Sequence, residues 1–220
     1  MVVTLKKPDG RTRVRRQPER GAYDRETIYA ILDEAFVCHV GFVFHGSPVV
    51  IPMAYARDGE RLLIHGSTAS RTMRALAEGA EACIAVTLFD AFVLARSAFH
   101  HSMNYRSVVL FARGNALEPD ADKVHAMHRF FDHVLPGRWD DCRPPNEKEI
   151  RATTMMAFPL EEASAKTRTG PVLDDAGDYA LPHWAGLLPW QSRALAPVAD
   201  ERLPGDIDVP DYLEDHRRER

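Results

Sequence analysis

Residues 36–65 read FVCHVGFVFHGSPVVIPMAYARDGERLLIH. They contain three runs rich in β-branched and aromatic residues, separated by His45-Gly46-Ser47 and by Asp58-Gly59. Asp-Gly between two such runs is a strong signal for a tight hairpin turn, and the first turn also contains a glycine. The segment therefore predicts three consecutive antiparallel strands.

Further elements extend this sheet. Asp24 is placed to cap a helix that runs to about Ala35. Downstream we expect strands at 82–88, 92–95, 104–117 and 153–160, and helices at about 70–79, at 119–134 and after Asn146. Because helices do not alternate with every strand, the pattern favours an antiparallel barrel with helices packed outside it over a doubly wound parallel sheet. Beyond residue 164 the periodicity fades, and we expect an extended C-terminal arm that wraps over the body.

Composition restricts the class of protein. The 220 residues are 45% hydrophobic and 27% charged, as in water-soluble globular chains. A net charge of −4 gives no reason to expect nucleic-acid binding. The longest apolar run, residues 49–56, is far shorter than the roughly 20 residues that span a bilayer. With no secretory signal and three scattered cysteines, we expect a cytoplasmic protein without a membrane or nucleic-acid partner.

Charge also suggests the domain boundaries. Residues 1–20 carry seven basic side chains and two acidic ones, whereas the last twenty or so residues are mainly acidic. Charge runs are usually exposed to solvent. We therefore expect a basic N-terminal tail (1–20), one domain (21–190) and a polar C-terminal tail (191–220).

The residues that most suggest chemistry follow the third strand, where 65–72 read HGSTASRT. A helix beginning near Ser70 would present free backbone N–H groups to an oxyanion, and the Arg71 guanidinium suits phosphate oxygens. Hydroxyl donors stand at Ser67, Thr68, Ser70 and Thr72, and Gly66 would let a ligand approach the backbone. The composition is that of a phosphate site, but an ordinary capped helix with a surface arginine explains the same residues.

Across residues 20–190 the chain resembles the pyridoxamine 5′-phosphate oxidase-like family of FMN-binding split β-barrels, nearest the nitroimidazole-resistance and flavin-nucleotide-binding branch. The resemblance rests on PVVIPMAY (48–55), HGSxxSR (65–71), NYRSVVLF (104–111) and AKTR (165–168). It implies a mainly β (α+β) fold, a six- to seven-stranded antiparallel split β-barrel with flanking helices. It also implies a homodimer that binds FMN at its interface and acts on a small-molecule substrate.

The resemblance implies roles for particular residues. Ser70 and Arg71 would hold the FMN phosphate, His65 and Gly66 would lie beside the flavin, and Lys166 and Arg168 would reach it from the partner subunit. The expected cofactor-binding set is Ile51, Pro52, Met53, Tyr55, His65, Gly66, Ser67, Ser70, Arg71, Thr72, Arg106, Ser107, Lys166 and Arg168. No catalytic residue is assigned, and no metal site is predicted, although His125, His128 and His133 lie on one predicted helix.

Two departures argue against the vitamin oxidase activity itself. Those oxidases resemble this chain in the Ser-Arg pair but carry a lysine where Thr72 stands, and their C-terminal Arg-x-His motif has no clear counterpart. The expectation is therefore a flavin-dependent oxidoreductase with an unidentified small substrate. The alternatives are a non-catalytic flavin carrier or sensor, and a binder of haem or a deazaflavin in the same barrel with His65 or His100 as an axial ligand.

Overall fold

The computed structural model describes residues 10–214. Within this part of the chain, ten strands form one antiparallel sheet in the order β1-β9-β6-β5-β2-β3-β4-β8-β7, with β10 added beside β5. The strands are β1 (Gly21–Ala22), β2 (Val37–Phe44), β3 (Ser47–Asp58), β4 (Arg61–Ser67), β5 (Glu81–Leu94), β6 (Ser102–Arg113), β7 (Asn115–Ala116), β8 (Thr153–Pro159), β9 (Ala163–Arg168) and β10 (Gly186–Pro189). The sheet curls without closing, which confirms the predicted split barrel.

The three strands predicted from residues 36–65 are confirmed. Phe44 pairs with Ser47 across the first turn, and Asp58 pairs with Arg61 across the second. His45 and Gly46 at the first turn, and Gly59 at the second, adopt positive φ angles. Such angles match the right-handed twist of the flanking strands, which is why these turn residues favour hairpins.

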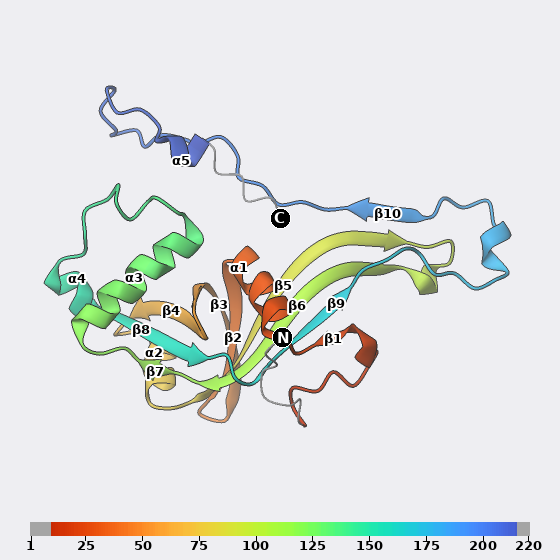
Figure 1. Cartoon of the computed structure of the whole chain (residues 1–220), viewed down its shortest axis with the longest axis horizontal. Coiled ribbons are helices and arrows are strands. Elements are labelled where there is room, and N and C mark those ends of the chain that lie inside the picture. Colours follow the sequence, from red (N-terminus) through yellow and green to blue (C-terminus); the bar gives the residue numbers. More distant parts are fainter. Residues whose placement is uncertain (1–9, 215–220) are drawn as a thin grey trace.

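Residues 10–214 contain five α-helices: α1 (Arg25–Glu34), α2 (Arg71–Ala77), α3 (Asp120–Val134), α4 (Glu147–Ala152) and α5 (Asp211–Glu214). The first four pack beside the sheet, whereas α5 lies on the C-terminal arm (Figure 1). The predicted caps are confirmed, since Asp24 accepts from the Thr27 N–H at 2.8 Å and Asn146 forms a reciprocal capping box with Glu149. The apolar face of α1 (Ile28, Ile31 and Leu32) is buried in the main core.

Two predictions about the sheet are wrong. Residues 81–94 form one continuous strand with an irregularity between Phe89 and Ala91, not two strands joined by a turn. Residues 163–168, expected to begin the arm, form β9, which pairs with β6 on one side and with β1 on the other. A strand with few apolar side chains is stabilised there by its two neighbours, a tertiary effect that overrides local composition.

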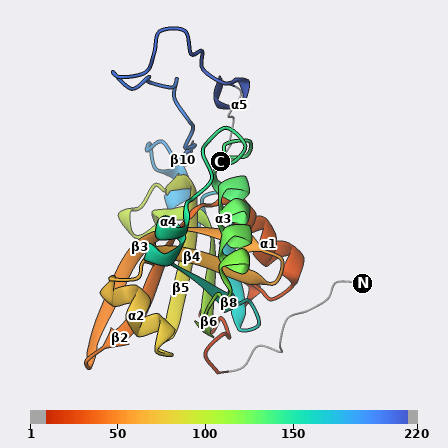
Figure 2. The same cartoon turned by 90° about the vertical axis from the view of Figure 1, so that its left-hand side faces the viewer.

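Figure 1 shows β5 and β6 extending from the body as a long two-stranded ribbon, with α3 and α4 at the opposite end of the molecule. The C-terminal arm lies along the ribbon as β10, where the Trp190 N–H donates to the Asp90 carbonyl at 2.9 Å. The arm then returns above the body, as both views show (Figures 1 and 2). In α5 the Tyr212 hydroxyl donates to the Asp141 carboxylate at 2.7 Å.

The N-terminal segment, predicted as a solvated tail, lies partly outside the described residues (1–9). Its described portion contacts the body, because Arg11 pairs with Glu81 at 2.9 Å and with Glu162 at 2.5 Å. Residues 215–220 of the predicted C-terminal tail also lie outside the described part. In residues 10–214, no helix has the length and apolar character needed to cross a membrane.

One face of the central strands is left exposed in the described chain. Strand register places Pro52, His39 and Ala85 in one row across β3, β2 and β5, and Val50, Gly41 and Cys83 in the next. Val50 is 62% exposed, and Pro52, His39 and Cys83 are exposed as well. The opposite faces of these strands carry the buried core residues Cys38, Val40 and Ile84. The exposed rows thus form a sheet face, mostly apolar, that residues 10–214 do not cover.

Candidate functional site

The predicted phosphate residues gather where β4 leads into α2. Ser70 caps α2, and its hydroxyl accepts from the Met73 N–H at 3.5 Å. Ser67 folds the preceding loop, since its hydroxyl accepts from the Ala69 N–H at 3.2 Å. The exposed Arg71 guanidinium lies 5.2 Å from the Phe44 ring centre, and no acidic side chain of residues 10–214 forms an ion pair with it. A helix start with an uncompensated arginine suits an anion.

Gly66 has a packing role. A Cβ atom at this position would lie 2.8 Å from the Met73 Cγ, so a larger residue would collide with the side chain below it. Thr72, also in the predicted set, is buried beside Met73 at the start of α2. The absence of a side chain at Gly66 therefore allows α2 to pack against β4, independently of any ligand.

Strand β3 presents part of its backbone at a free edge. Residues 47–54 pair with β2, whereas β4 pairs only with residues 55–58. Pro52, which lacks an N–H, lies in this edge segment, where proline is tolerated. Ile51 and Met53 point toward the main core, and the buried Tyr55 donates its hydroxyl to the Leu32 carbonyl at 2.7 Å. Contacts from the free edge to a ligand would therefore be made mainly by the backbone.

Arg106 is held by two acidic residues. Its guanidinium donates to Asp90 at 2.7 Å and to both carboxylate oxygens of Glu34. Hydrogen bonds to Glu34 and Asp90 raise the pKa of Arg106 above its usual range. The structure thus gives Arg106 partners within its own chain that link α1 to the β5–β6 ribbon.

The remaining predicted residues lie on β6 and β9. The Ser107 hydroxyl donates to the Lys166 carbonyl at 3.2 Å, and the buried Arg168 donates to the Asn104 side chain. Burial lowers the pKa of Arg168. In the sheet, β6 is separated from β4 by β5, β2 and β3. The expected set therefore forms two groups: one near β4, α2 and the edge of β3, and the other on β6 and β9.

His65 lines a cavity that was not predicted from the sequence. Its imidazole packs edge to face against Phe130 of α3, in a partly open cavity of about 200 Å³. Burial lowers the pKa of His65, which favours the neutral imidazole. Other cavity residues are Met127, Phe131, Pro145, Glu149, Thr153 and Met155. No pattern in the sequence predicts this cavity, because α3 and β8 meet β4 only in the folded chain.

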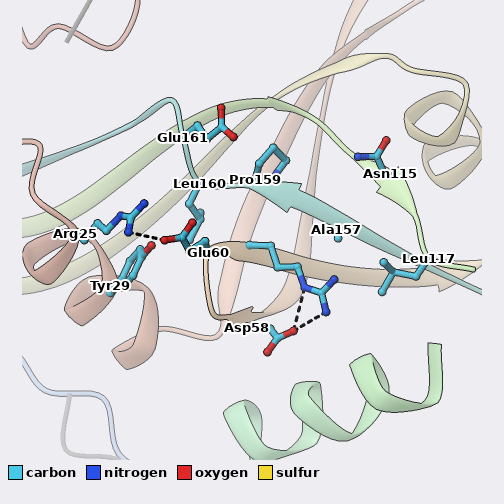
Figure 3. Close-up of a pocket in the computed structure, with 11 residues that line it drawn as sticks. Arg25, Tyr29, Asp58, Glu60, Asn115, Leu117, Ala157, Pro159, Leu160 and Glu161 are labelled. Carbon is cyan, nitrogen blue, oxygen red and sulfur yellow. Dashed lines mark hydrogen bonds and ion pairs between the residues drawn. The ribbon is translucent and has the colours of Figure 1, made fainter. Parts of the chain in front are cut away.

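A larger cavity of about 440 Å³ lies at the opposite end of β4 (Figure 3). Arg25 pairs with Glu60 at its margin, and Arg61 pairs with Asp58. The buried Arg25 Nε and Tyr29 hydroxyl have no hydrogen-bond partner among residues 10–214. These polar atoms suit water molecules or a small polar ligand, and none of the cavity residues belongs to the predicted set.

The histidines of α3 do not gather around a common point. His128 stacks on Trp139 with ring centres 5.3 Å apart, whereas the His133 Nε2 lies 2.8 Å from the Ala35 carbonyl. Each of these two rings thus has a local packing or hydrogen-bonding role.

Comparisons with known proteins agree with this architecture. The family model described as pyridoxamine 5′-phosphate oxidase matches residues 24–167. The flavocytochrome Anf3 from Azotobacter vinelandii is 40% identical, with a TM-score of 0.88 over 94% of this chain and 96% of that one. The FAD and heme binding protein from Mycobacterium smegmatis is 33% identical, with a TM-score of 0.87 over 91% and 98% of the two chains.

A more distant structure shows the fold alone. A protein named for 5-nitroimidazole antibiotic resistance from Bacteroides thetaiotaomicron is 21% identical, with a TM-score of 0.56 over 66% of this chain and 85% of that one. The search of curated proteins found no match.

The family match covers more than half of the chain and includes the β4–α2 junction and most of the sheet. On this evidence the chain belongs to the pyridoxamine 5′-phosphate oxidase family.

Proposed function

We propose that this protein is a homodimeric flavin-binding redox protein that acts as an oxidoreductase on a small molecule. The observation that carries the proposal is the likeness, over more than 90% of both chains, to a flavocytochrome and to an FAD and heme binding protein. A bound flavin supplies electron-transfer chemistry, while the protein supplies binding, orientation and electrostatics.

The β4–α2 junction fits the phosphate end of a flavin. Arg71 has no acidic partner among the described residues, and the first backbone N–H groups of a helix favour an anion. The free edge of β3 offers backbone groups to a ring system. In this arrangement Arg71 binds the phosphate, and Ser67 and Ser70 hold the loop in shape.

The form of the flavin is part of the proposal. The sequence resemblance implies FMN, whereas the mycobacterial relative is described as binding FAD. Both contain the phosphate that Arg71 would bind, so the site described here suits either. We favour FAD, because that relative matches nearly the whole chain. Chromatography of the flavin released by acid distinguishes the two.

A second copy of the chain would complete the site. Neither of the two cavities described above is lined by Ser70 or Arg71. The exposed sheet face around Val50 and Cys83 is mostly apolar, and burial of such a surface is a main source of stability in homodimers. Lys166 lies opposite Ser107, and both are partly buried. We propose that this face forms the dimer interface and that Lys166 and Arg168 contribute to the partner's flavin site.

A haem is a second candidate cofactor, favoured by the cavity at His65. His65 is exposed to solvent and borders a cavity that Met127, Phe130 and Met155 also line. A neutral imidazole in this position has the chemistry of an axial ligand. At about 200 Å³ the cavity is smaller than the ~300–1,000 Å³ of typical ligand sites, so the described chain does not enclose a haem. His65 is our candidate for the ligand, and the residues around it would contact one edge of the haem.

The visible absorption spectrum of the purified protein, with light scattering, tests the proposal. We expect a flavin spectrum and a particle of about twice 24.7 kDa. A Soret band that His65→Ala removes, and that His39→Ala on the exposed sheet face retains, would support the haem. A protein that binds no flavin when reconstituted would refute the flavin proposal. Turnover with a nicotinamide donor separates an oxidoreductase from a flavin carrier.

We place the protein in the cytoplasm, a proposal supported by its three free cysteines.

A further inference from the structure

We propose that His100, Asp174 and Asp178 form a binding site for a divalent first-row transition-metal ion such as Zn²⁺. The site lies at the far end of the β5–β6 ribbon. A short 3₁₀ turn (Ala98–His100) joins the two strands there, and the loop after β9 returns beside it with a second 3₁₀ turn (Asp178–Ala180), as Figure 1 shows. One potential ligand atom from each of the three side chains lies within 4.8 Å of the others.

The orientation of His100 is fixed by a neighbour outside the cluster. The Ser97 hydroxyl lies 2.9 Å from Nδ1 of His100, and the imidazole is mostly shielded from solvent. Histidines that bind metals usually engage their other ring nitrogen in such a hydrogen bond, which sets the tautomer and the ring plane. Nε2 then faces the acidic loop, where Asp175 Oδ1 lies 3.7 Å away.

Asp174 is held in place from the other side. Its carboxylate is fully shielded from solvent and accepts from the Arg96 backbone N–H at 3.1 Å and from the Arg96 guanidinium at 3.0 Å. The Arg96 guanidinium also lies 5.1 Å from the Tyr179 ring centre. Arg96 thus positions Asp174 and offsets the negative charge of its carboxylate. The carboxylates of Asp175 and Asp178 leave the cluster with a net negative charge, which attracts a cation.

The donor set indicates the class of metal. One imidazole nitrogen with carboxylate oxygens suits Zn²⁺ and similar ions, whereas Mg²⁺ prefers oxygen ligands alone. Zinc bonds of about 2.0–2.2 Å in a tetrahedron place ligand atoms roughly 3.4 Å apart, so the side chains would move slightly inward around the ion. Water would occupy any position that the three side chains leave open.

An ion at this position would join two segments that are far apart in the sequence, the tip of the ribbon and the base of the C-terminal arm. Because it would bind the folded chain and not the separated segments, it should stabilise the native state. None of the three residues belongs to the predicted flavin-binding set.

Metal titration of the purified full-length protein, dialysed against a chelator, tests the site. Zn²⁺ is followed by calorimetry, and Co²⁺ is followed by the visible bands that report its ligand geometry. We expect one ion per chain and at least tenfold weaker binding in His100→Ala. Asp178→Asn should also weaken Zn²⁺ binding. This second variant shows whether the loss in His100→Ala comes from the missing ligand and not from a local structural change at residue 100.

The matched control is His101→Ala. His101 is exposed, and its Nδ1 contacts the Ser97 carbonyl at 2.9 Å, but it is not part of the cluster. The His101→Ala protein should bind Zn²⁺ with the same affinity as the unaltered protein. Equal Zn²⁺ affinity in His100→Ala and the unaltered protein would overturn the proposal, as would a site that binds Mg²⁺ in preference to Zn²⁺. Flavin content measured in the same samples tests the proposed function separately.

Discussion

The rings of His65 and Phe130 meet edge to face, with their centres 4.6 Å apart. This contact joins the end of β4 to the middle of α3 and shields one side of the imidazole from water. Burial lowers the pKa of His65 below its ordinary value of 6.5, so the neutral ring is the form that fits the fold. A neutral ring is also the form that binds a metal or a haem iron.

The first prediction concerns acid. Because the pKa of His65 is lowered by folding, its contribution to stability is present above 6.5 and is lost as the pH falls through the lower folded value. His65→Gln removes this titration. Between about pH 7.5 and about pH 5 the melting temperature of the unaltered protein should therefore fall more than that of the variant. A constant difference between the two across this range would contradict the prediction.

The second prediction concerns the flavin phosphate. Arg71→Ala removes a charge-assisted contact worth about 1.5–3 kcal/mol, which is a roughly 10- to 150-fold loss of FMN affinity. Riboflavin lacks the phosphate and should bind both proteins equally. Arg74→Ala, an exposed arginine one turn further along α2, is the control and should leave FMN binding unchanged. Quenching of flavin fluorescence measures each affinity. If Arg71→Ala weakened riboflavin as much as FMN, the arginine would support the fold or the ring site instead.

The third prediction separates a structural role of Arg106 from a flavin contact. Its ion pairs with Glu34 and Asp90 are partly shielded from solvent. Arg106→Ala leaves two carboxylates without their donor and should cost about 1.5–3 kcal/mol of stability in the flavin-free protein. Denaturant unfolding measures this loss, with Arg71→Ala as the comparison that should unfold nearly as the unaltered protein does. A stable Arg106→Ala that fails only in flavin binding would favour the contact predicted from the sequence.

The fourth prediction tests why residue 66 is a glycine. Gly66→Ala introduces a methyl group 2.8 Å from the Met73 Cγ and should lower stability by about 1–3 kcal/mol. In the background of Met73→Ala the same change should cost much less, because the colliding atoms are gone. A double-mutant cycle from thermal unfolding provides the test. Additive effects would mean that the packing against Met73 is not the reason for the glycine.

The fifth prediction addresses the exposed sheet face. Val50→Glu places a charge on this face and should convert the proposed dimer to a monomer without loss of secondary structure. Val198→Glu, at a position in the arm that is 94% exposed, is the control. Light scattering and circular dichroism together provide the measurement. A Val50→Glu protein that remains dimeric would place the interface elsewhere.

Local signals in the sequence were sufficient for much of the fold. Asp24 and Asn146 begin helices as predicted, because a side-chain cap acts within three residues. The turns at Gly46 and Gly59 likewise depend on backbone angles that the glycines permit. β9 was not predicted, because Ala163–Arg168 gains strand structure from β6 and β1, which come from distant parts of the chain.

The candidate site was less predictable for the same reason. The ion pair between Arg106 and Glu34 joins residues 72 positions apart, and no pattern in either segment predicts it. The position of His65 beside a flavin stays a prediction. Its place in a cavity with Met127 and Met155 was not predicted, because these residues belong to a helix and a strand that the sequence does not link to β4. The start of α2 at Arg71 and its cap at Ser70 were predictable because a cap depends on one turn of one helix.

The C-terminal arm is attached at two distant places, at Trp190 on the ribbon and at Tyr212 beside Asp141. The residues between, 191–209, are all exposed. This segment acts as a linker, so its length matters more than the identity of its side chains. An extended chain spans at most about 3.3–3.6 Å per residue, which limits the distance that the linker can bridge. Substitutions within it should therefore be well tolerated, whereas a deletion that makes it shorter than the distance it spans would detach α5 from the rest of the protein.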